Sequence, residues 1–120
     1  MADHNDLGEL GEELAVKKLR RDGYEILERN WRFGKEEVDI IARLGEELVI
    51  IEVKTRNSDF FGEPHQFVSR SKQNHLIRAA HAYIQRHDLD VETRFDVIGI
   101  VVNNKGERLE HIEGAFIPRW

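Results

Sequence analysis

The sequence predicts an α/β domain in which helices flank a central mixed sheet. Two segments with helical patterning, near residues 6–22 and 69–87, alternate with apolar runs that are typical of strands. One of these runs, residues 47–56, is apolar on both faces over most of its length, which is typical of a central strand covered by helices. The predicted element order is α-β-β-β-α-β-β, in a single domain over residues 1–120.

The first helix begins at a capping signal, Asp6 followed by Glu9, and ends before Gly23. Its apolar stripe consists of Leu7, Leu10, Leu14, Ala15 and Leu19. Glu12 lies on the same side of this helix as Ala15 and Leu19, whereas Glu9 and Glu13 point more towards solvent. Glu12 is therefore either a boundary residue paired with a nearby base or part of a metal site.

Residues 24–33 form the first predicted strand, and a tight hairpin with the two-residue loop Gly45-Glu46 follows it. That loop pairs residues whose numbers sum to 91, so Asp39 faces Glu52 and Glu37 faces Lys54. These four side chains share one face of the hairpin, with opposed pairs about 5 Å apart. The opposite face is predicted to be core: Val38, Ile40, Ala42, Leu44, Val49, Ile51 and Val53.

The second half of the chain begins with a loop over residues 60–68. Ser69 or Ser71 then caps a helix that runs to about His87, with Leu76, Ile77, Ala80 and Ile84 facing inward. An apolar strand over residues 91–102, a turn at 103–106 and a short strand over 108–112 complete the sheet. The apolar segment 115–117 is compatible with either a dimer interface or a closing edge of the core.

Composition excludes several classes of protein. The chain has no cysteine, no apolar run long enough for a membrane helix and no signal-peptide core, which favours a cytoplasmic protein. It also lacks a His-x-x-x-His pair, a phosphate-binding glycine loop and a Gly-x-Ser-x-Gly elbow, which argues against zinc, nucleotide and acyl-transfer enzymes.

The net charge of −5 weighs against tight nonspecific binding to nucleic acid, although basic side chains can still be localised. Two small basic clusters, at residues 17–21 and 29–32, are more typical of solvated faces than of phosphate tracks.

The acidic end of the hairpin is the strongest functional signal. Clustered carboxylates beside an ammonium group are what a Mg²⁺-dependent phosphodiesterase needs, and burying Glu52 or Lys54 without a partner is costly. The alternative is that Glu37, Asp39, Glu52 and Lys54 simply neutralise one another at a strand end.

Asp39 followed by Glu52-Val53-Lys54 matches the core motif of the PD-(D/E)XK nuclease superfamily. More narrowly, the chain resembles the YraN-like family of small bacterial proteins, which is grouped with restriction-endonuclease-like folds and lies close to Holliday-junction resolvases. The matching stretches are 7–12 with Ala15, 23–32, 37–41, 49–56, Gly62, 72–73 and 94–97. Gln66-Phe67, where an acidic residue and a small one are usual, departs from the pattern.

This resemblance implies a restriction-endonuclease-like fold and a Mg²⁺- or Mn²⁺-dependent endonuclease that acts on DNA, including branched DNA. Asp39 and Glu52 would be metal ligands and Lys54 the catalytic lysine. Glu12 would complete the metal site from the first helix, and Gln73 would support it from the second. Resolvase-like relatives often act as homodimers.

Two other readings remain open. One is a non-catalytic module that binds nucleic acid or protein and retains the nuclease fold. The other is a nuclease with the same chemistry that acts on RNA.

Overall fold

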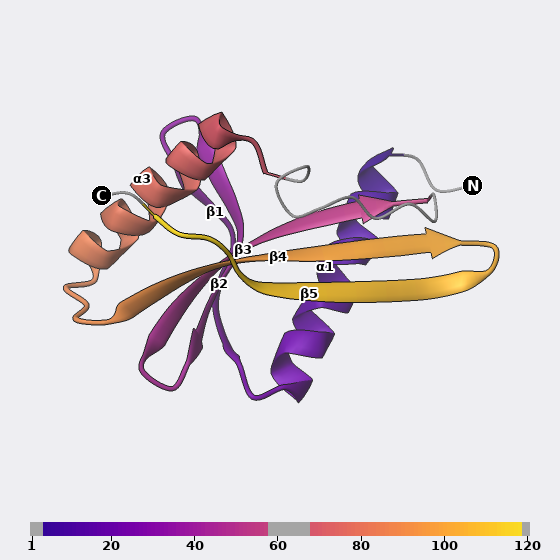
Figure 1. Ribbon diagram of the computed structural model, residues 1–120, viewed down its shortest axis with the longest axis horizontal. Coiled ribbons are helices and arrows are strands. Elements are labelled where there is room, and N and C mark those ends of the chain that lie inside the picture. The colour runs from indigo at the N-terminus through magenta and orange to yellow at the C-terminus, as the bar shows by residue number, and fades with distance from the viewer. Residues whose placement is uncertain (1–3, 58–67, 119–120) are drawn as a thin grey trace.

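The computed structural model describes residues 4–57 and 68–118, which form two helices and a five-stranded sheet (Figure 1). The elements are α1 (His4–Arg21), β1 (Glu25–Phe33), β2 (Glu36–Leu44), β3 (Glu47–Arg56), α3 (Arg70–Arg86), β4 (Glu92–Asn103) and β5 (Gly106–Phe116). The order confirms the predicted α-β-β-β-α-β-β arrangement. The segment that carries the predicted 60–68 loop and the Gln66-Phe67 departure lies, apart from Val68, outside the described residues.

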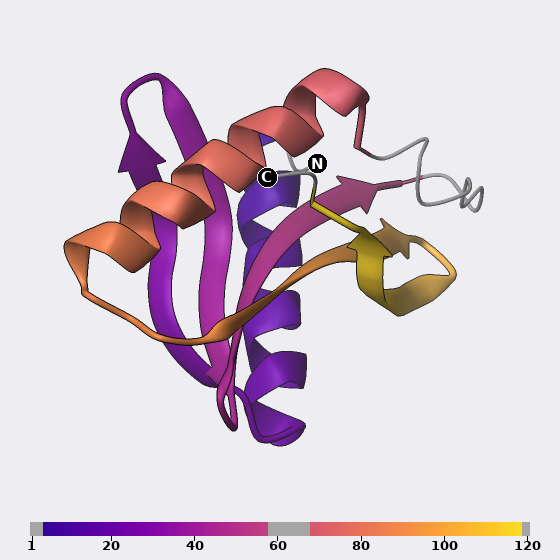
Figure 2. The ribbon, with the colours of Figure 1, turned by 60° about the vertical axis from the view of Figure 1, so that its left-hand side comes forward.

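The five strands follow one another across the sheet in the order β1-β2-β3-β4-β5. Three neighbouring pairs are antiparallel, and β3 and β4 are parallel because α3 connects them. Figure 2 shows α3 crossing one face of the sheet while α1 lies behind it. The mixed sheet with a helix on each face confirms the predicted fold class.

Each face of the sheet carries its own hydrophobic core. On one face, Ala15, Val16 and Leu19 of α1 pack against a cluster that includes Ile40 and Ile51. On the other face, residues of α3, including Leu76 and Tyr83, pack against a second cluster. Burial on both faces explains why β3 reads as a nearly continuous apolar run.

The hairpin of β2 and β3 has the predicted register. Ile40 pairs with Ile51 and Leu44 pairs with Glu47, so the residue numbers sum to 91. Gly45 has a φ of 62°, the left-handed conformation that a tight turn needs and that glycine adopts without steric cost. The turn therefore sets which carboxylates approach one another at the far end of the strands.

The predicted faces of β2 are wrong at one position. Val38 packs in the α3-side core, whereas Ile40 packs in the α1-side core. Residues two apart share a face in a regular strand, so β2 changes face at Asp39. On the adjacent strand, Asn30 has a φ of 53°, which marks an irregularity beside Asp39. The hydrophobic periodicity of the sequence does not predict this change of face.

The two helices begin and end close to their predicted positions. Ser69 caps α3, and its hydroxyl accepts a hydrogen bond from the Lys72 backbone N–H at 3.1 Å. Leu10 of α1, predicted in the apolar stripe, is instead 39% exposed. Neither helix in the described part of the chain is long and apolar enough to span a membrane.

The last strand is longer than predicted and its end closes the α3-side core. Phe116 stacks on Phe95, with ring centroids 4.9 Å apart, and Ala115 packs against the same cluster. Ile117 is 85% exposed. Residues 115–117 were compatible with a dimer interface or a closing edge of the core, and the first two of them fit a closing edge.

Candidate active site

The structure brings Asp39 and Glu52 together, as the hairpin register predicts. Asp39 is on β2 and Glu52 on the neighbouring strand β3. The Asp39 Oδ2 atom accepts a hydrogen bond of 2.8 Å from the Val53 backbone N–H. Asp39 also forms a side-chain hydrogen bond with Glu52, which is only 4% exposed. A nearly buried carboxyl group therefore touches a second one where the pairing of β2 and β3 ends.

The environment of Glu52 strongly favours its protonated form. Burial makes the largest contribution, and the negative charge of Asp39 adds to it, so the pKa of Glu52 rises to about 7. The charges of Lys72 and Lys54 act in the opposite direction. This pair of carboxyl groups is electrostatically unfavourable when both are ionised, and a cation would relieve that repulsion.

Two lysines border the pair. The Nζ atom of Lys54 lies 3.5 Å from Glu52 Oε2, and that of Lys72 lies 3.7 Å from the same oxygen. The Lys54 side chain is 41% exposed, so its ammonium can also reach a ligand in solvent. Lys72 is a member of the site that sequence reasoning passed over in favour of its neighbour Gln73.

Gln73 makes different contacts. Its Nε2 atom donates a hydrogen bond of 3.2 Å to the Val68 carbonyl oxygen, and its side chain lines a pocket beside the end of β5. The residue from α3 that touches the carboxylates is thus Lys72. The sequence feature that could have pointed to Lys72 is the cap at Ser69, which places Lys72 in the first turn of α3.

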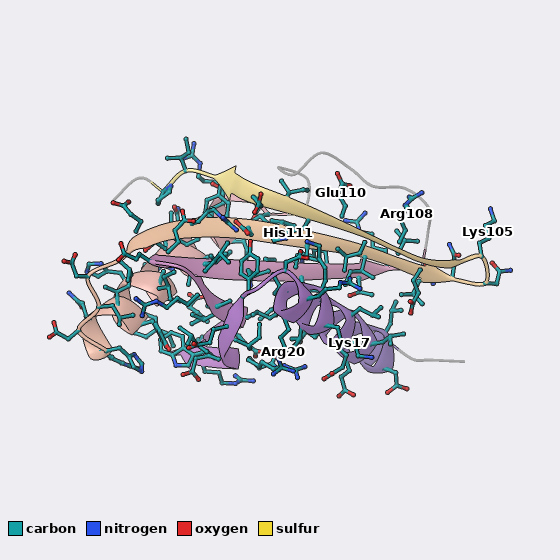
Figure 3. The ribbon with its side chains drawn as sticks, turned by 90° about the horizontal axis from the view of Figure 1, so that it is seen from below. Lys17, Arg20, Lys105, Arg108, Glu110 and His111 are labelled. Atoms are coloured by element: carbon teal, nitrogen blue, oxygen red, sulfur yellow. The ribbon has the colours of Figure 1, made fainter. Side chains whose placement is uncertain are left out.

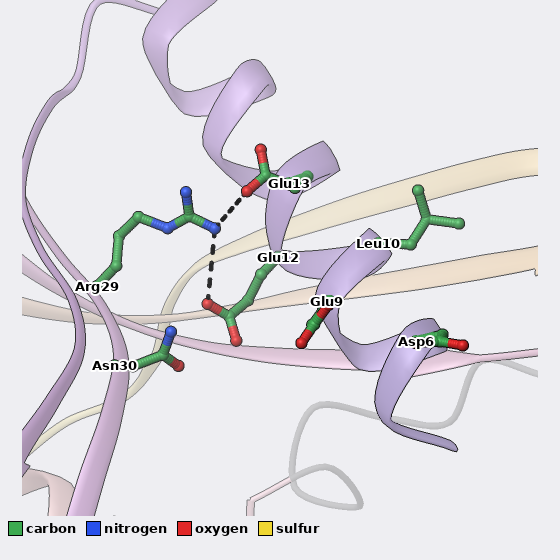
Figure 4. A pocket seen from close by; sticks show the side chains of 7 residues that line it. All are labelled: Asp6, Glu9, Leu10, Glu12, Glu13, Arg29 and Asn30. Carbon is green, nitrogen blue, oxygen red and sulfur yellow. Dashed lines mark hydrogen bonds and ion pairs between the residues drawn. The ribbon is translucent and has the colours of Figure 1, made fainter. Parts of the chain in front are cut away.

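Glu12 approaches Asp39 from α1, as predicted. Its pKa is raised, chiefly by burial and then by the negative charge of Asp39, while a hydrogen bond with Asn30 lowers it. Figure 4 shows Glu12 between Arg29 and Asn30 in a pocket of about 480 Å³. Arg29 Nη2 is 3.9 Å from Glu12 and 2.7 Å from Glu13. The Glu12 Oε1 atom is buried without a hydrogen-bond partner.

The three carboxylates do not form a single cage. Asp39 contacts Glu52, and Asp39 and Glu12 line one pocket of about 230 Å³. Over residues 4–57 and 68–118, however, no three His, Asp or Glu side chains are placed to hold one metal ion. Hard oxygen donors, a buried carboxylate oxygen that, among the described residues, only the 3.9 Å ion pair with Arg29 addresses, and a repelling acid pair nevertheless suit Mg²⁺, which often takes only one or two protein carboxylates.

Glu37 does not face Lys54, and this part of the prediction is wrong. The paired residues of β2 and β3 end at Ile40 and Ile51, so the strands are no longer in register at Glu37. Glu37 instead forms an ion pair of 3.3 Å with Arg32 of β1.

The two basic clusters in the sequence are partly neutralised. Lys18 pairs with Asp22, while Arg29 binds Glu12 and Glu13. Figure 3 shows Lys17 and Arg20 on α1, and both residues are exposed. This fits the prediction that these clusters are solvated faces.

A family model described as "Uncharacterised protein family UPF0102" matches residues 11–100. The chain belongs to family UPF0102. This agrees with the resemblance to YraN-like proteins that the sequence motifs indicated.

UPF0102 proteins from several bacteria align with almost the whole chain. One from Christiangramia forsetii is 51% identical over 97% of this chain and 98% of its own length. Another, from Bacteroides thetaiotaomicron, is 46% identical over 98% of each chain. A solved structure, Pyrococcus furiosus SfsA in complex with Ca²⁺, is 14% identical with a TM-score of 0.42. The match covers 92% of this chain and 64% of SfsA.

This UPF0102 chain contains a second polar cluster that sequence reasoning missed. Asp96 is buried on β4 and accepts hydrogen bonds from Arg94, from His111 Nε2 at 2.7 Å and from the Gly114 N–H at 3.0 Å. Arg94 also contacts Tyr24 and forms an ion pair with Glu113. The sequence feature that indicates this cluster is an aspartate inside an apolar strand. Arg94 lies two residues away on the same strand, but Tyr24, His111 and Gly114 come from other elements.

Proposed function

We propose that the protein is a divalent-metal-dependent endonuclease that hydrolyses DNA phosphodiester bonds. Asp39 and Glu52 would hold the metal, and Lys54 would act on the scissile phosphate. The observation that carries this proposal is the contact between Asp39 and the nearly buried Glu52, with Lys54 3.5 Å from Glu52. A purely structural pair of strands has no need to bury one carboxyl group against another.

The metal would be Mg²⁺ or Mn²⁺, and Glu12 would assist from α1. When bound, the metal ion would neutralise phosphate charge and lower the pKa of a bound water. Asp39 is held in place for this role because its carboxylate is anchored to the Val53 backbone. Glu12 offers an oxygen without a hydrogen-bond partner beside the same pocket, so it can orient a water near the metal.

The lysines supply positive charge where negative charge develops during hydrolysis. Lys54 is partly exposed and would bind a non-bridging phosphate oxygen, an interaction that strengthens as the charge on the phosphate increases. Lys72 is also partly exposed and lies at the same oxygen of Glu52, so it would hold Glu52 ionised in the reacting complex. Gln73 is left with a supporting role at the start of α3.

The main rival is a binding module that retains the fold without catalysis. The ion pairs of Lys54 and Lys72 with Glu52 favour it, because they neutralise the buried carboxylate without any metal. A single experiment that measures nucleic-acid cleavage distinguishes the two functions.

The experiment incubates the purified protein with Mn²⁺ and end-labelled linear, nicked, flapped and four-way DNA, with a parallel RNA set. We expect cleavage of at least one DNA substrate, abolished by EDTA and by Asp39→Asn. Lys54→Ala should reduce cleavage by about 10²-fold or more without changing Mn²⁺ affinity appreciably. Lys17→Ala, on exposed α1, is the matched control. If the wild type leaves every substrate intact, the binding module replaces this proposal.

A further inference from the structure

The charge of α3 differs sharply from that of the rest of the chain. The protein carries 18 Lys and Arg against 23 Asp and Glu, yet α3 has four Lys or Arg, two His and no acidic residue. One side of α3 is buried through Leu76, Ala79, Ala80 and Tyr83. Its basic and polar side chains lie on the remaining surface, where Lys72 contacts Glu52 and Arg78 contacts Glu36 while staying 56% exposed. The net positive charge of this surface complements a polyanion.

A pocket of about 550 Å³ lies between α3 and the edge strand β1. Four polar residues of α3, at positions i, i+4, i+7 and i+11, line it together with apolar groups from both elements. Its lining is Phe33, Asn74, Ile77, Arg78, His81, Ala82 and Gln85. The pocket therefore combines an apolar floor with several hydrogen-bonding side chains, which is the composition of a ligand site.

Phe33, which lines this pocket, is flanked by an aromatic ring and a guanidinium group that are not among the lining residues. The rings of Trp31 and Phe33 are nearly parallel, at 7°, with centroids 6.4 Å apart. The Arg86 guanidinium carbon lies 5.6 Å from each centroid. Flat aromatic and guanidinium surfaces of this kind are what unpaired bases stack on.

The walls of the pocket are tied together. Glu36, at the start of β2, binds His75 at 2.9 Å and Arg78 at 3.3 Å. These two contacts attach the β1–β2 hairpin to α3 and hold Phe33 opposite the polar stripe. The Arg78 side chain remains 56% exposed, so it can also contact a phosphate.

We propose that the pocket between β1 and α3 binds an unpaired segment of nucleic acid. A base would stack at Phe33, and Arg78 would contact the adjoining phosphate. Asn74, His81 and Gln85 would hydrogen-bond the edge of the base. Bases in a duplex are stacked inside the helix and do not enter such a pocket, so single strands bind better. The inference deepens the proposed function, on which it rests, by assigning the enzyme a substrate with a single-stranded arm.

The test measures binding without cleavage. Fluorescence anisotropy follows a labelled oligothymidylate, which cannot pair with itself, as full-length protein is added in EDTA. The same titration uses a duplex of equal length. We expect the single strand to bind at least about fivefold more tightly than the duplex, which corresponds to one stacked base. Equal affinity, or no binding of the single strand, would overturn the inference.

Paired variants assign the binding to this pocket. Phe33→Leu keeps an apolar side chain and removes the aromatic ring, and should weaken binding at least about fivefold. Arg78→Gln should weaken it and reduce the slope of log affinity against log salt concentration by roughly one. Arg20→Gln removes the same charge from exposed α1 and should change affinity less than twofold. Gln85→Ala, which is exposed, provides a second test of the pocket if Phe33→Leu fails to fold.

If Arg78→Gln and Arg20→Gln weaken binding equally, the interaction is general electrostatics and the inference is wrong. A protein that shows this binding pattern but cleaves nothing would refute only the proposed nuclease activity. A protein that cleaves DNA but binds single strands no better than duplex would refute only the pocket.

Discussion

The Asp39 carboxylate accepts a hydrogen bond of 2.8 Å from the backbone N–H of Val53, just beyond the last paired residues of β2 and β3. A side chain thus takes the place of a backbone acceptor where the two strands separate. This hydrogen bond holds a charged group at the strand end, next to Glu52. The same residue therefore contributes to the stability of the hairpin and to the candidate active site.

Asp39→Ala and Asp39→Asn should separate these two contributions. Alanine leaves the Val53 N–H without its acceptor, which should cost roughly 1–3 kcal/mol in the free energy of unfolding. Asparagine can still accept that hydrogen bond through its amide oxygen, so the cost should be smaller. Urea unfolding at pH 5 measures both, because Glu52 is then largely protonated and adds little repulsion. Equal losses for the two variants would show that the hydrogen bond contributes little.

Glu52 should make the metal-free protein less stable as the pH rises. Its pKa is raised from 4.5 to about 7 in the folded state, so the folded protein binds more protons than the unfolded chain in this range. The resulting stability is fully present below about pH 4.5 and is lost as the pH rises through about 7, a change on the order of 3 kcal/mol.

Glu52→Gln should abolish this loss. Relative to the wild type, the variant should gain stability between pH 5 and pH 8 in urea titrations with EDTA. Glu110→Gln, on the exposed surface of β5, is the control and should show no such gain. A difference between Glu52→Gln and the wild type that stays constant with pH would contradict this prediction.

Gly11 should be the point of closest approach between α1 and β3. A Cβ atom placed there would lie 1.8 Å from Thr55 Oγ1 and under 3 Å from two further atoms of the same side chain. Gly11→Ala should therefore destabilise the protein by about 1–3 kcal/mol, more than alanine's helix propensity returns. It should also displace the neighbouring Glu12 from Asp39.

Gly8→Ala is the matched substitution in the same helix. No atom lies within 4 Å of a Cβ at this exposed position, so alanine should stabilise α1 by roughly 0.5–1 kcal/mol. Thermal or urea unfolding of both variants tests the pair. Similar effects of the two substitutions would show that α1 does not pack closely on β3 at Gly11.

Asp96→Ala should be strongly destabilising, by about 3–5 kcal/mol, because it leaves the largely buried Arg94 without its main partner. Burial raises the pKa of Asp96, but hydrogen bonds from His111 and Arg94 lower it by a larger amount, so the net shift is downward. The stability that this shift provides is present above about pH 4 and is lost as the pH falls below it. Acid unfolding of the wild type and Asp96→Asn provides the measurement, and identical acid midpoints would contradict it.

The sequence predicted the elements of this fold well because its signals are local. The Gly45 turn set the hairpin register, which brings Asp39 near Glu52, and the hydrogen bond from the Val53 N–H holds Asp39 there beyond the last paired residues. The pairing of Glu37 with Lys54 failed because β2 changes face at Asp39, opposite an irregularity at Asn30 on another strand.

The remaining parts of the site depend on tertiary contacts. Lys72 reaches Glu52 only because the first turn of α3 lies near the middle of β3. The Asp96 cluster joins Arg94 of the same strand to Tyr24, His111 and Glu113, and no sequence spacing relates β4 to these other segments. Local sequence patterns indicate the chemistry of each residue, but they do not predict which residues it contacts.

The most direct test of the proposed site is a calorimetric titration with Mn²⁺ at pH 7.5, comparing the wild type with Asp39→Asn, Glu52→Gln and the surface control Glu110→Gln. We predict one tight Mn²⁺ site in the wild type and in Glu110→Gln, weakened at least about tenfold in each of the other two variants. Unchanged Mn²⁺ affinity in Asp39→Asn and Glu52→Gln, or no Mn²⁺ binding by the wild type, would contradict the assignment of these two carboxylates as metal ligands.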